Sequence, residues 1–414
     1  MKNKIEFETL HSNKHRIYLL CGIVCIVVLM VTLIITTSKA KYKTTQSLPL
    51  INGTINYDLS DLNLIGAYIQ EGEEYIQTNE IPLSGYEFNS EKSYCTVNGE
   101  NINATINFDI ETQTLSIVPL TKKGTKCYLY FDEKSSGSEY ILASPNAPTN
   151  HTTDWTGKES YYYTGNPDNW VSFAGFYWRI IRINGDGSIR MIYQGVNDSP
   201  TPDAGNMTGE GTQIGTSAFN TSANHKTYVG LVYNETSQHG YGTNSTVMNR
   251  LNDWYNSNLT NYEEKYIDTE TGFCSDRNMA NGSIFNDNGI LYYAPSERSY
   301  ANASLNCNEL DILSQDNKKL PNSIGLLTSD EYLLASNTDD TNYLMVEIDY
   351  WTMSPHDFSA SGSAGIFTVW SMAKIMGVND TDDHLGVRPV INVKADVQIT
   401  GTGSQTDPFK VATS

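Results

Sequence analysis

The feature that most constrains this chain is an apolar stretch near its beginning, residues 17–37, which reads IYLLCGIVCIVVLMVTLIITT and contains no charged side chain. At about 1.5 Å of rise per residue, a helix of this length measures roughly 30 Å, the thickness of the hydrocarbon core of a bilayer. The stretch therefore predicts a transmembrane helix. A buried core helix fits poorly, because nothing upstream could cover it.

A cleaved signal peptide is the alternative interpretation, because Ser38-Lys39-Ala40 has the pattern of a cleavage site, although the apolar core of a signal peptide is usually only about 7–15 residues long. Four basic residues precede the stretch and three follow it, so the large polar chain that follows decides the orientation. We expect a cytoplasmic tail over residues 1–16, a single pass through the plasma membrane over residues 17–37, and an extracellular remainder.

Charge and composition narrow the possible partners. The chain carries 27 Lys and Arg against 47 Asp and Glu, and seven of the basic but only two of the acidic residues lie in the first 43, so the remainder stands near −25. The electrostatic field of this negative net charge repels phosphate backbones and anionic lipid. Nucleic acid is therefore not an expected partner. The 27 tyrosines suit recognition loops on an exported β-rich protein. A drift of codon usage toward Asn and Tyr would give the same composition.

Cysteine usage agrees with export. Two of the six cysteines lie in the apolar stretch, and the other four allow three connectivities. We expect disulfides between Cys95 and Cys127 and between Cys274 and Cys307, because each pair lies within one predicted domain. Four reduced, buried thiols are the alternative.

The pattern of apolar residues divides the rest of the chain. Ile102, Ile106 and Phe108 belong to a strict alternation with polar residues, which predicts a strand with one buried face, and Asn98-Gly99 before it is a two-residue hairpin signal. The expected parts are a stalk at 38–80, a small β module at 81–133, a linker at 134–159 and a large domain at 160–414.

The large domain opens on two strand-like runs, WVSFAGFYWRIIRI and SIRMIYQG, joined by Asn184-Gly185-Asp186-Gly187. This pattern predicts a hairpin, and the turn resembles a calcium loop only faintly because the distal bidentate Glu is missing. A helix with Val247 and Leu251 on one face should start at Asn244 or Ser245, and the capping box 328–331 should open a second helix. We expect the strands around Trp178 to pack near the last strands, at 387–393.

Six blocks between about residues 160 and 411 resemble the repeated ectodomain of predicted, functionally uncharacterised bacterial surface proteins. They are YYYTGNPDNW, WRIIRINGDGSIRMIYQG, LNDWYNSNL, GLLTSDEYLLAS, YWTMSP and GVRPVINVKADVQITGTGSQTDPF. Their order also resembles, more distantly, that of C-type-lectin-like and formylglycine-generating domains. The expected fold class is therefore α+β: an N-terminal transmembrane helix, a small all-β module and a C-type-lectin-like α+β domain with long loops.

The activities of the resembled domains do not carry over. The formylglycine-generating resemblance implies a pair of reactive cysteines near the end of the domain, and no Cys follows Cys307. Lectin-type calcium binding implies a polar-Pro-polar loop late in the domain, whereas Asn166-Pro167-Asp168 lies at its start. Neither an H-E-x-x-H helix nor a G-x-x-x-x-G-K-[ST] loop is present. We expect no cofactor and no metal site.

Five residues remain candidates for contacting a ligand. Asn166 and Asp168 flank a proline near the start of the domain, and His356 lies in the later loop region. His356 could also be paired with Cys274 as a thiol dyad, but a disulfide is the simpler fate of that cysteine. Asp382 and Asp383 form an acidic loop, which reads as a solvated turn with cation binding as the alternative.

These observations predict a membrane-anchored extracellular binding or adhesion protein. Its ligand would be a surface glycan or protein, held by the long loops at 195–244 and 353–385 of the C-terminal domain. The alternative function is that of an exported hydrolase or transferase with an acidic or thiol site in the same loops. A buried, mutually hydrogen-bonded set of titratable groups in a pocket would favour the enzyme.

Overall fold

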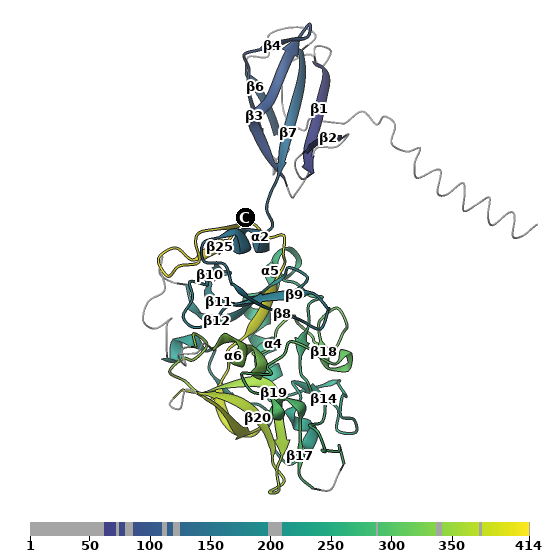
Figure 1. Ribbon diagram of the computed structural model, residues 1–414, viewed down its shortest axis with the longest axis vertical. Coiled ribbons are helices and arrows are strands. Elements are labelled where there is room, and N and C mark those ends of the chain that lie inside the picture. Colours follow the sequence, from purple (N-terminus) through teal and green to yellow (C-terminus); the bar gives the residue numbers. More distant parts are fainter. Residues whose placement is uncertain are drawn as a thin grey trace, which may run out of the picture. The chain divides into compact units, whose positions relative to one another are not determined.

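The computed structural model describes residues 62–71, 74–78, 86–109, 114–118, 125–197, 209–286, 289–336, 342–371 and 375–413 (Figure 1). The predicted tail, the predicted transmembrane segment and much of the predicted stalk lie outside these residues. Within the described ranges no helix has both the length and the apolar character needed to cross a bilayer. The chain divides into two compact units, Met1–Lys134 and Ser135–Ser414, called unit 1 and unit 2 below.

The described part of the chain is mostly β, with 41% strand, 16% helix and four α-helices, so the predicted α+β class with a transmembrane helix is wrong. Both predicted helices exist, but they span only 13 and seven residues. The polar segments around them are tied together by strands of two or three residues. These short strand pairs satisfy the hydrogen bonds of backbone groups in segments whose sequence shows no periodicity. The pattern of apolar residues therefore predicted too few strands.

Unit 1 is a five-stranded sheet in the order β2-β1-β7-β3-β4, accompanied by the hairpin of β5 and β6. One face of the sheet is apolar and carries buried Ala67, Leu129 and Phe131, and Ile106 and Phe108 of the hairpin belong to the same core. The strands are β1 Leu62–Glu71, β2 Glu74–Thr78, β3 Tyr86–Val97, β4 Glu100–Ile102, β5 Thr105–Asp109, β6 Thr114–Val118 and β7 Thr125–Glu133.

The predicted stalk is wrong for its last part, because β1 and β2 belong to the sheet of unit 1. β1 pairs in parallel with β7, and Ala67 is only 1% exposed. The pairing is irregular at the start of β1. Leu62 and Leu64 pair with the consecutive residues Thr125 and Lys126 of β7, so β1 has one extra residue there. Such a bulge shifts the phase of an alternating strand, so the apolar positions of β1 do not keep a simple period of two.

Two local predictions in unit 1 are confirmed. Asn98 and Gly99 form the turn between β3 and β4 with φ of 54° and 88°, the left-handed conformation that a type I′ hairpin requires at both positions. Cys95 and Cys127 form a disulfide between directly paired residues of β3 and β7. The bond therefore fixes the register of the two strands at the centre of the sheet.

Unit 2 contains two larger sheets and two small ones. The first sheet has the order β23-β12-β11-β10-β25-β24, with β9 on β11 and β8 on β9, and the second has the order β13-β22-β19-β20-β21, with β17 on β19. The strands of the first sheet are β8 Asn150–Thr153, β9 Glu159–Tyr162, β10 Trp170–Phe173, β11 Phe176–Ile183, β12 Ile189–Val196, β23 Val390–Val393, β24 Ile399–Thr400 and β25 Phe409–Val411.

The second sheet and the small pairs are built from the middle of the chain. The strands of the second sheet are β13 Thr216–Ala218, β17 Leu291–Tyr292, β19 Tyr350–Phe358, β20 Ala364–Trp370, β21 Ile375–Asp380 and β22 His384–Gly386. The small pairs are β14 Val232–Tyr233 with β15 Thr243–Asn244, and β16 Phe273–Cys274 with β18 Ile312–Leu313. Short 3₁₀ helices span Gly209–Thr212, Lys226–Val229, Ala294–Glu297 and Glu309–Asp311.

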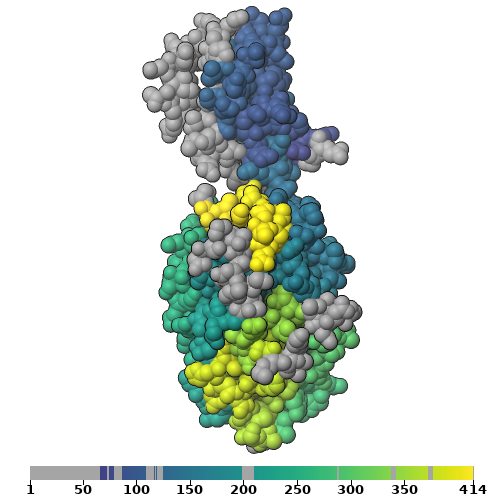
Figure 2. Space-filling model, turned by 90° about the vertical axis from the view of Figure 1, so that its left-hand side faces the viewer, coloured from purple at the N-terminus to yellow at the C-terminus, as the bar shows by residue number. Residues whose placement is uncertain are grey.

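The predicted linker is also wrong, because residues 135–159 are part of unit 2. They contain α2, Gly137–Ala143, and the strand β8, and β9 begins at Glu159. The overlooked signal is a capping box, in which Ser136 accepts from the backbone of Glu139 and the Glu139 side chain accepts from the backbone of Ser136. The Tyr140 hydroxyl then donates to the Gly401 carbonyl. Figure 2 shows the C-terminal residues (yellow) on the surface of unit 2 beside dark teal residues of its N-terminal part.

The predicted packing of the strands around Trp178 near those at 387–393 is confirmed. β11 and β12 form the expected antiparallel hairpin, and β12 pairs antiparallel with β23 from Ile189 and Val393 to Ile192 and Val390. Gly187 in the hairpin turn has a φ of 88°, which favours glycine. Residues far apart in sequence thus share the centre of the first sheet.

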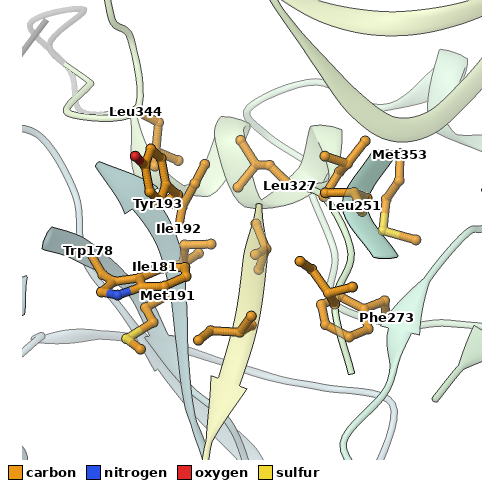
Figure 3. Close-up of a cluster of buried hydrophobic side chains, with 14 of the residues drawn as sticks. Trp178, Ile181, Met191, Ile192, Tyr193, Leu251, Phe273, Leu327, Leu344 and Met353 are labelled. Carbon is orange, nitrogen blue, oxygen red and sulfur yellow. The ribbon is translucent and has the colours of Figure 1, made fainter. Parts of the chain in front are cut away.

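The two predicted helices of unit 2 begin where the sequence predicts. α4, Thr246–Asn258, is capped by Ser245, and α6, Ser329–Ala335, is opened by the reciprocal capping box of Thr328 and Glu331. The remaining helix, α5, spans Thr260–Tyr266. One hydrophobic cluster joins residues of both large sheets and α4, and Figure 3 shows part of it: Trp178, Ile181, Met191, Ile192, Tyr193, Leu251, Phe273, Leu327, Leu344 and Met353.

Candidate functional site

The five predicted ligand residues separate into two groups at opposite ends of unit 2. His356, Asp382 and Asp383 belong to the end formed by β17 and the turn between β19 and β20, and Asn166 and Asp168 precede β10 at the other end (Figure 1). The structure therefore brings three of the five to one end of unit 2 and places the other two elsewhere.

At the first end, two aspartates that the sequence did not indicate, Asp357 and Asp380, lie close to the predicted residues. The imidazole Nδ1 of His356 is 3.2 Å from Asp357 Oδ1, and its ring packs edge-on against Phe367. Asp357 is paired with Gly365 and Gly365 with Asp380, so both carboxylates flank one glycine across three strands. A prediction of this strand register from the sequence would have indicated Asp357 and Asp380 as neighbours.

The acidic residues of this end interact electrostatically. Burial raises the pKa of Asp380, a hydrogen bond with Ser363 opposes that rise, and the negative charges of Asp383, Asp382 and Asp357 add to it. Asp382 and Asp383 are exposed, and Asn379 Nδ2 donates to Asp383 at 3.0 Å. Among the described residues no group of three or more His, Cys, Asp or Glu is arranged to hold a metal ion.

At the second end, Asp168 lines a surface groove of about 230 Å³. One wall comes from the segment 146–150 and the other from the end of β9 and the loop that follows it. We call this the Asn-Pro-Asp groove; it is lined by Asn146, Ala147, Pro148, Thr149, Asn150, Tyr162, Tyr163, Thr164, Pro167 and Asp168. Asn166 is exposed but does not line it. Half of this groove was missed because residues 146–150 had been assigned to a linker.

The loop that carries Asp168 is held rigidly from behind by Arg179. Its guanidinium donates to the side chain of Asn169 at 2.5 Å and to the carbonyl of Pro167 at 2.9 Å, and it stacks on the rings of Trp170 and Tyr343. Burial lowers the pKa of Arg179 to about 10, well above neutral pH, so the group stays charged. A rigid loop binds a ligand without first being ordered, which preserves affinity.

The wall of the groove offers both polar and aromatic groups. The Asn150 amide donates to Thr164 Oγ1 at 3.3 Å, and the carboxylate of Asp168 is exposed. Tyr162 is partly buried, and Tyr163 is 4% exposed with a hydroxyl that has no hydrogen-bond partner among the described residues. Burial raises the pKa of both phenols, so both remain neutral donors.

A separate cluster of buried charges lies inside unit 2, away from the predicted residues. Glu331 of α6 forms ion pairs with Arg182 of β11 and Arg190 of β12, and all three side chains are at most 2% exposed. Burial opposes ionisation of Glu331, but the two arginines outweigh it and the pKa of Glu331 is lowered. Charged residues inside the apolar runs WRIIRI and SIRMIY were the signal that a buried partner exists.

The same cluster continues toward the surface through Arg298, which pairs with Asp276 and Asp330. Burial would lower the pKa of Arg298, but these two carboxylates raise it. The cluster encloses only about 10 Å³, close to the lower limit for a single water molecule. There is no room for a substrate, so its charges serve to hold β11, β12 and α6 together.

Cys274 borders this cluster and forms a disulfide with Cys307, as predicted. The thiol dyad of Cys274 and His356 is therefore not formed, since a disulfide sulfur has no proton to give up. Comparison of the chain with known protein families, with curated proteins and with solved structures finds no match. The resemblance to lectin-like and formylglycine-generating domains remains a prediction.

Proposed function

We propose that the protein is an exported binding protein and that unit 2 binds a glycan in the Asn-Pro-Asp groove. The observation that carries this proposal is the combination of a tyrosine, two asparagine amides and a carboxylate around one rigid surface groove. Sugars combine apolar ring faces with many hydroxyl groups, so they need this mixture of aromatic surface and fixed donors and acceptors. The two disulfides support export, because such bonds persist in oxidising compartments.

The size of the groove indicates that it binds only a small part of a larger ligand. Its volume of about 230 Å³ is below the roughly 300–1,000 Å³ of sites that enclose a whole drug-sized molecule. A terminal sugar residue could place its hydroxyls against Asp168 and Asn150 while the rest of the glycan remains in solvent.

The test is glycan-array binding of the full chain together with Asp168→Asn. A hydrogen bond to a charged group contributes roughly 1.5–3 kcal/mol, so the variant should bind the best glycan at least about tenfold more weakly. Asp382→Asn is the control, because it removes another exposed carboxylate from the other end of unit 2 and should leave the affinity unchanged. Equal loss in both variants, or no glycan retained by the parent chain, would refute the proposal.

A further inference from the structure

Unit 2 contains an asparagine whose surroundings allow it to react with its own backbone. Asn281 is exposed and is followed by Gly282 in the turn 280–283. In an Asn-Gly pair the glycine nitrogen can attack the side-chain amide carbon of the asparagine, because glycine has no side chain to crowd the approach. Two other Asn-Gly pairs begin in the described part of the chain, at Asn98 and Asn184, and both are more tightly held.

Both reacting groups of the pair at Asn281 are free. Neither the Asn281 side-chain amide nor the Gly282 nitrogen forms a hydrogen bond with any residue that the structure describes. Ser283 N donates to the Ala280 carbonyl at 3.0 Å, which leaves the pair at the tip of the turn. Gly282 has a φ of 82°, and a β-carbon built on it would lie in open space. Rotation of the nitrogen onto the amide carbon is therefore unobstructed.

The chain around this turn is anchored. Ala280 N donates to the Tyr292 carbonyl at 2.9 Å, and Tyr292 N donates to Ser283 Oγ at 3.0 Å. The backbone nitrogen of Asn281 donates to Glu297 Oε1 at 3.0 Å. A carboxylate therefore lies directly beside the residue that would react, and it ties the turn to the rest of unit 2.

Asn184 is the opposite case. It is 3% exposed, and its Nδ2 donates to Ser188 Oγ at 2.8 Å and to Asn392 Oδ1 at 3.2 Å. The nitrogen that would attack it, that of Gly185, donates to Asp154 Oδ2 at 2.9 Å. Ring closure would break these bonds inside the fold, so this pair can react only from an opened state.

Asn98 is exposed but is held by its hairpin. Asn98 and Gly99 both have the left-handed backbone conformation, and Val97 pairs with Glu100 immediately beside them. Attack requires rotation about the bond between the Cα and the carbonyl carbon of Asn98, and the geometry of this two-residue turn opposes that rotation. Of the three pairs, the one at Asn281 is therefore the least restrained.

We propose that Asn281 is a site of spontaneous deamidation. The nitrogen of Gly282 bonds to the side-chain amide carbon, its proton passes through solvent to the amide nitrogen, and ammonia leaves. Water then opens the cyclic imide to aspartate or isoaspartate, so one water is consumed for each ammonia released. The new carboxylate repels Glu297, and isoaspartate also adds one carbon to the backbone, so the modified turn loses its hydrogen bond to that residue.

The experiment incubates the full chain in mildly alkaline buffer, with and without guanidinium chloride, and follows the gain of mass at each asparagine by peptide fragmentation. Fragment ions separate Asn281 from Asn288, which also precedes a glycine. In the native chain Asn281 should deamidate at least about 100-fold faster than Asn184, whereas the denaturant should bring the two rates within about threefold of each other. No gain of mass at Asn281, or a native rate at Asn98 or Asn184 that equals it, would overturn the proposal.

Two variants test the effect of the modification on the turn. Asn281→Asp carries the charge of the product and should raise the hydrogen-exchange rates of the Ala280 and Tyr292 amides at least about threefold. Asn281→Ser removes the same amide without adding a charge and should leave both rates unchanged. Equal exchange in the two variants would show that the new charge does not loosen the turn.

Discussion

Glu331→Gln should lower the free energy of unfolding of unit 2 by about 3–5 kcal/mol, the usual cost of removing one partner from a buried ion pair. The variant retains the shape of the side chain but leaves Arg182 and Arg190, both about 1% exposed, without their shared carboxylate. Urea unfolding followed by tryptophan fluorescence measures this directly. All six tryptophans lie between residues 155 and 370, so the signal reports unit 2 alone.

The chain contains a matched control for this substitution. Glu139 occupies the same third position of a capping box in α2, but it is exposed and no arginine is paired with it among the described residues. Glu139→Gln removes the charge from an equivalent cap and should cost less than about 1 kcal/mol. If the two substitutions cost the same, the capping role of Glu331 would explain the loss and the buried ion pairs would not.

The pH dependence of stability should separate the same two variants. Because the arginines hold the folded-state pKa of Glu331 below its ordinary value, its ionised form contributes stability at any pH above that ordinary value. This contribution disappears as the pH falls from there through the lower, folded-state pKa. The difference in unfolding free energy between the parent chain and Glu331→Gln should therefore shrink on acidification, whereas a constant difference would contradict the lowered pKa.

Replacing both Cys274 and Cys307 by serine should lower the melting temperature of unit 2 by roughly 6–8 °C. The bond joins residues 33 positions apart, and the chain-entropy model assigns such a loop roughly 3–4 kcal/mol. For a domain of this size roughly 2 °C of melting temperature corresponds to 1 kcal/mol. The segment between the cysteines also carries Arg298, which pairs with Asp276 and Asp330, so loosening it disturbs the edge of the charged cluster.

The corresponding double serine variant of Cys95 and Cys127 is the control, since it lies in the other compact unit. It should leave the melting of unit 2, followed by tryptophan fluorescence, unchanged. Labelling of Cys274 and Cys307 in the native parent chain, read by peptide mass, should fail until a reductant is added. Rapid labelling without reductant, or an unchanged melting temperature in the Cys274 and Cys307 variant, would show that this bond does not stabilise unit 2.

Features specified by neighbouring residues were predictable from the sequence. The Asn98-Gly99 turn, the hairpin at 184–187 and the capping box that opens α6 are confirmed, because each depends on residues at most a few positions apart. The packing of the strands around Trp178 near those at 387–393 was also expected, from the lectin-like resemblance and the apolar character of both segments, and the pairing of β12 with β23 confirms it. In these cases the local chemistry and the final fold agree.

Features that depend on distant pairing were not predictable. Arg182 lies 149 positions from Glu331, and nothing in either local sequence specifies the other. The Asn-Pro-Asp groove needs the segment 146–150, which has no periodicity and was assigned to a linker. Tyr241 and Gln315 likewise come from separate loops, which line one surface hollow only in the folded chain. Polar loops gain their position from tertiary contacts, so their side chains carry little signal of their own.

The disulfide between Cys95 and Cys127 also determines how unit 1 responds to mechanical tension. Because it links β3 directly to β7, a force that pulls on the two ends of the chain is transmitted through the sulfur atoms and bypasses β4, β5 and β6. The 32 positions between the two cysteines, roughly 110 Å of extended chain, cannot lengthen until the bond is reduced. Reductant would thus release a fixed extra contour length from a stretched molecule, and the bond acts as a limiter of its extension.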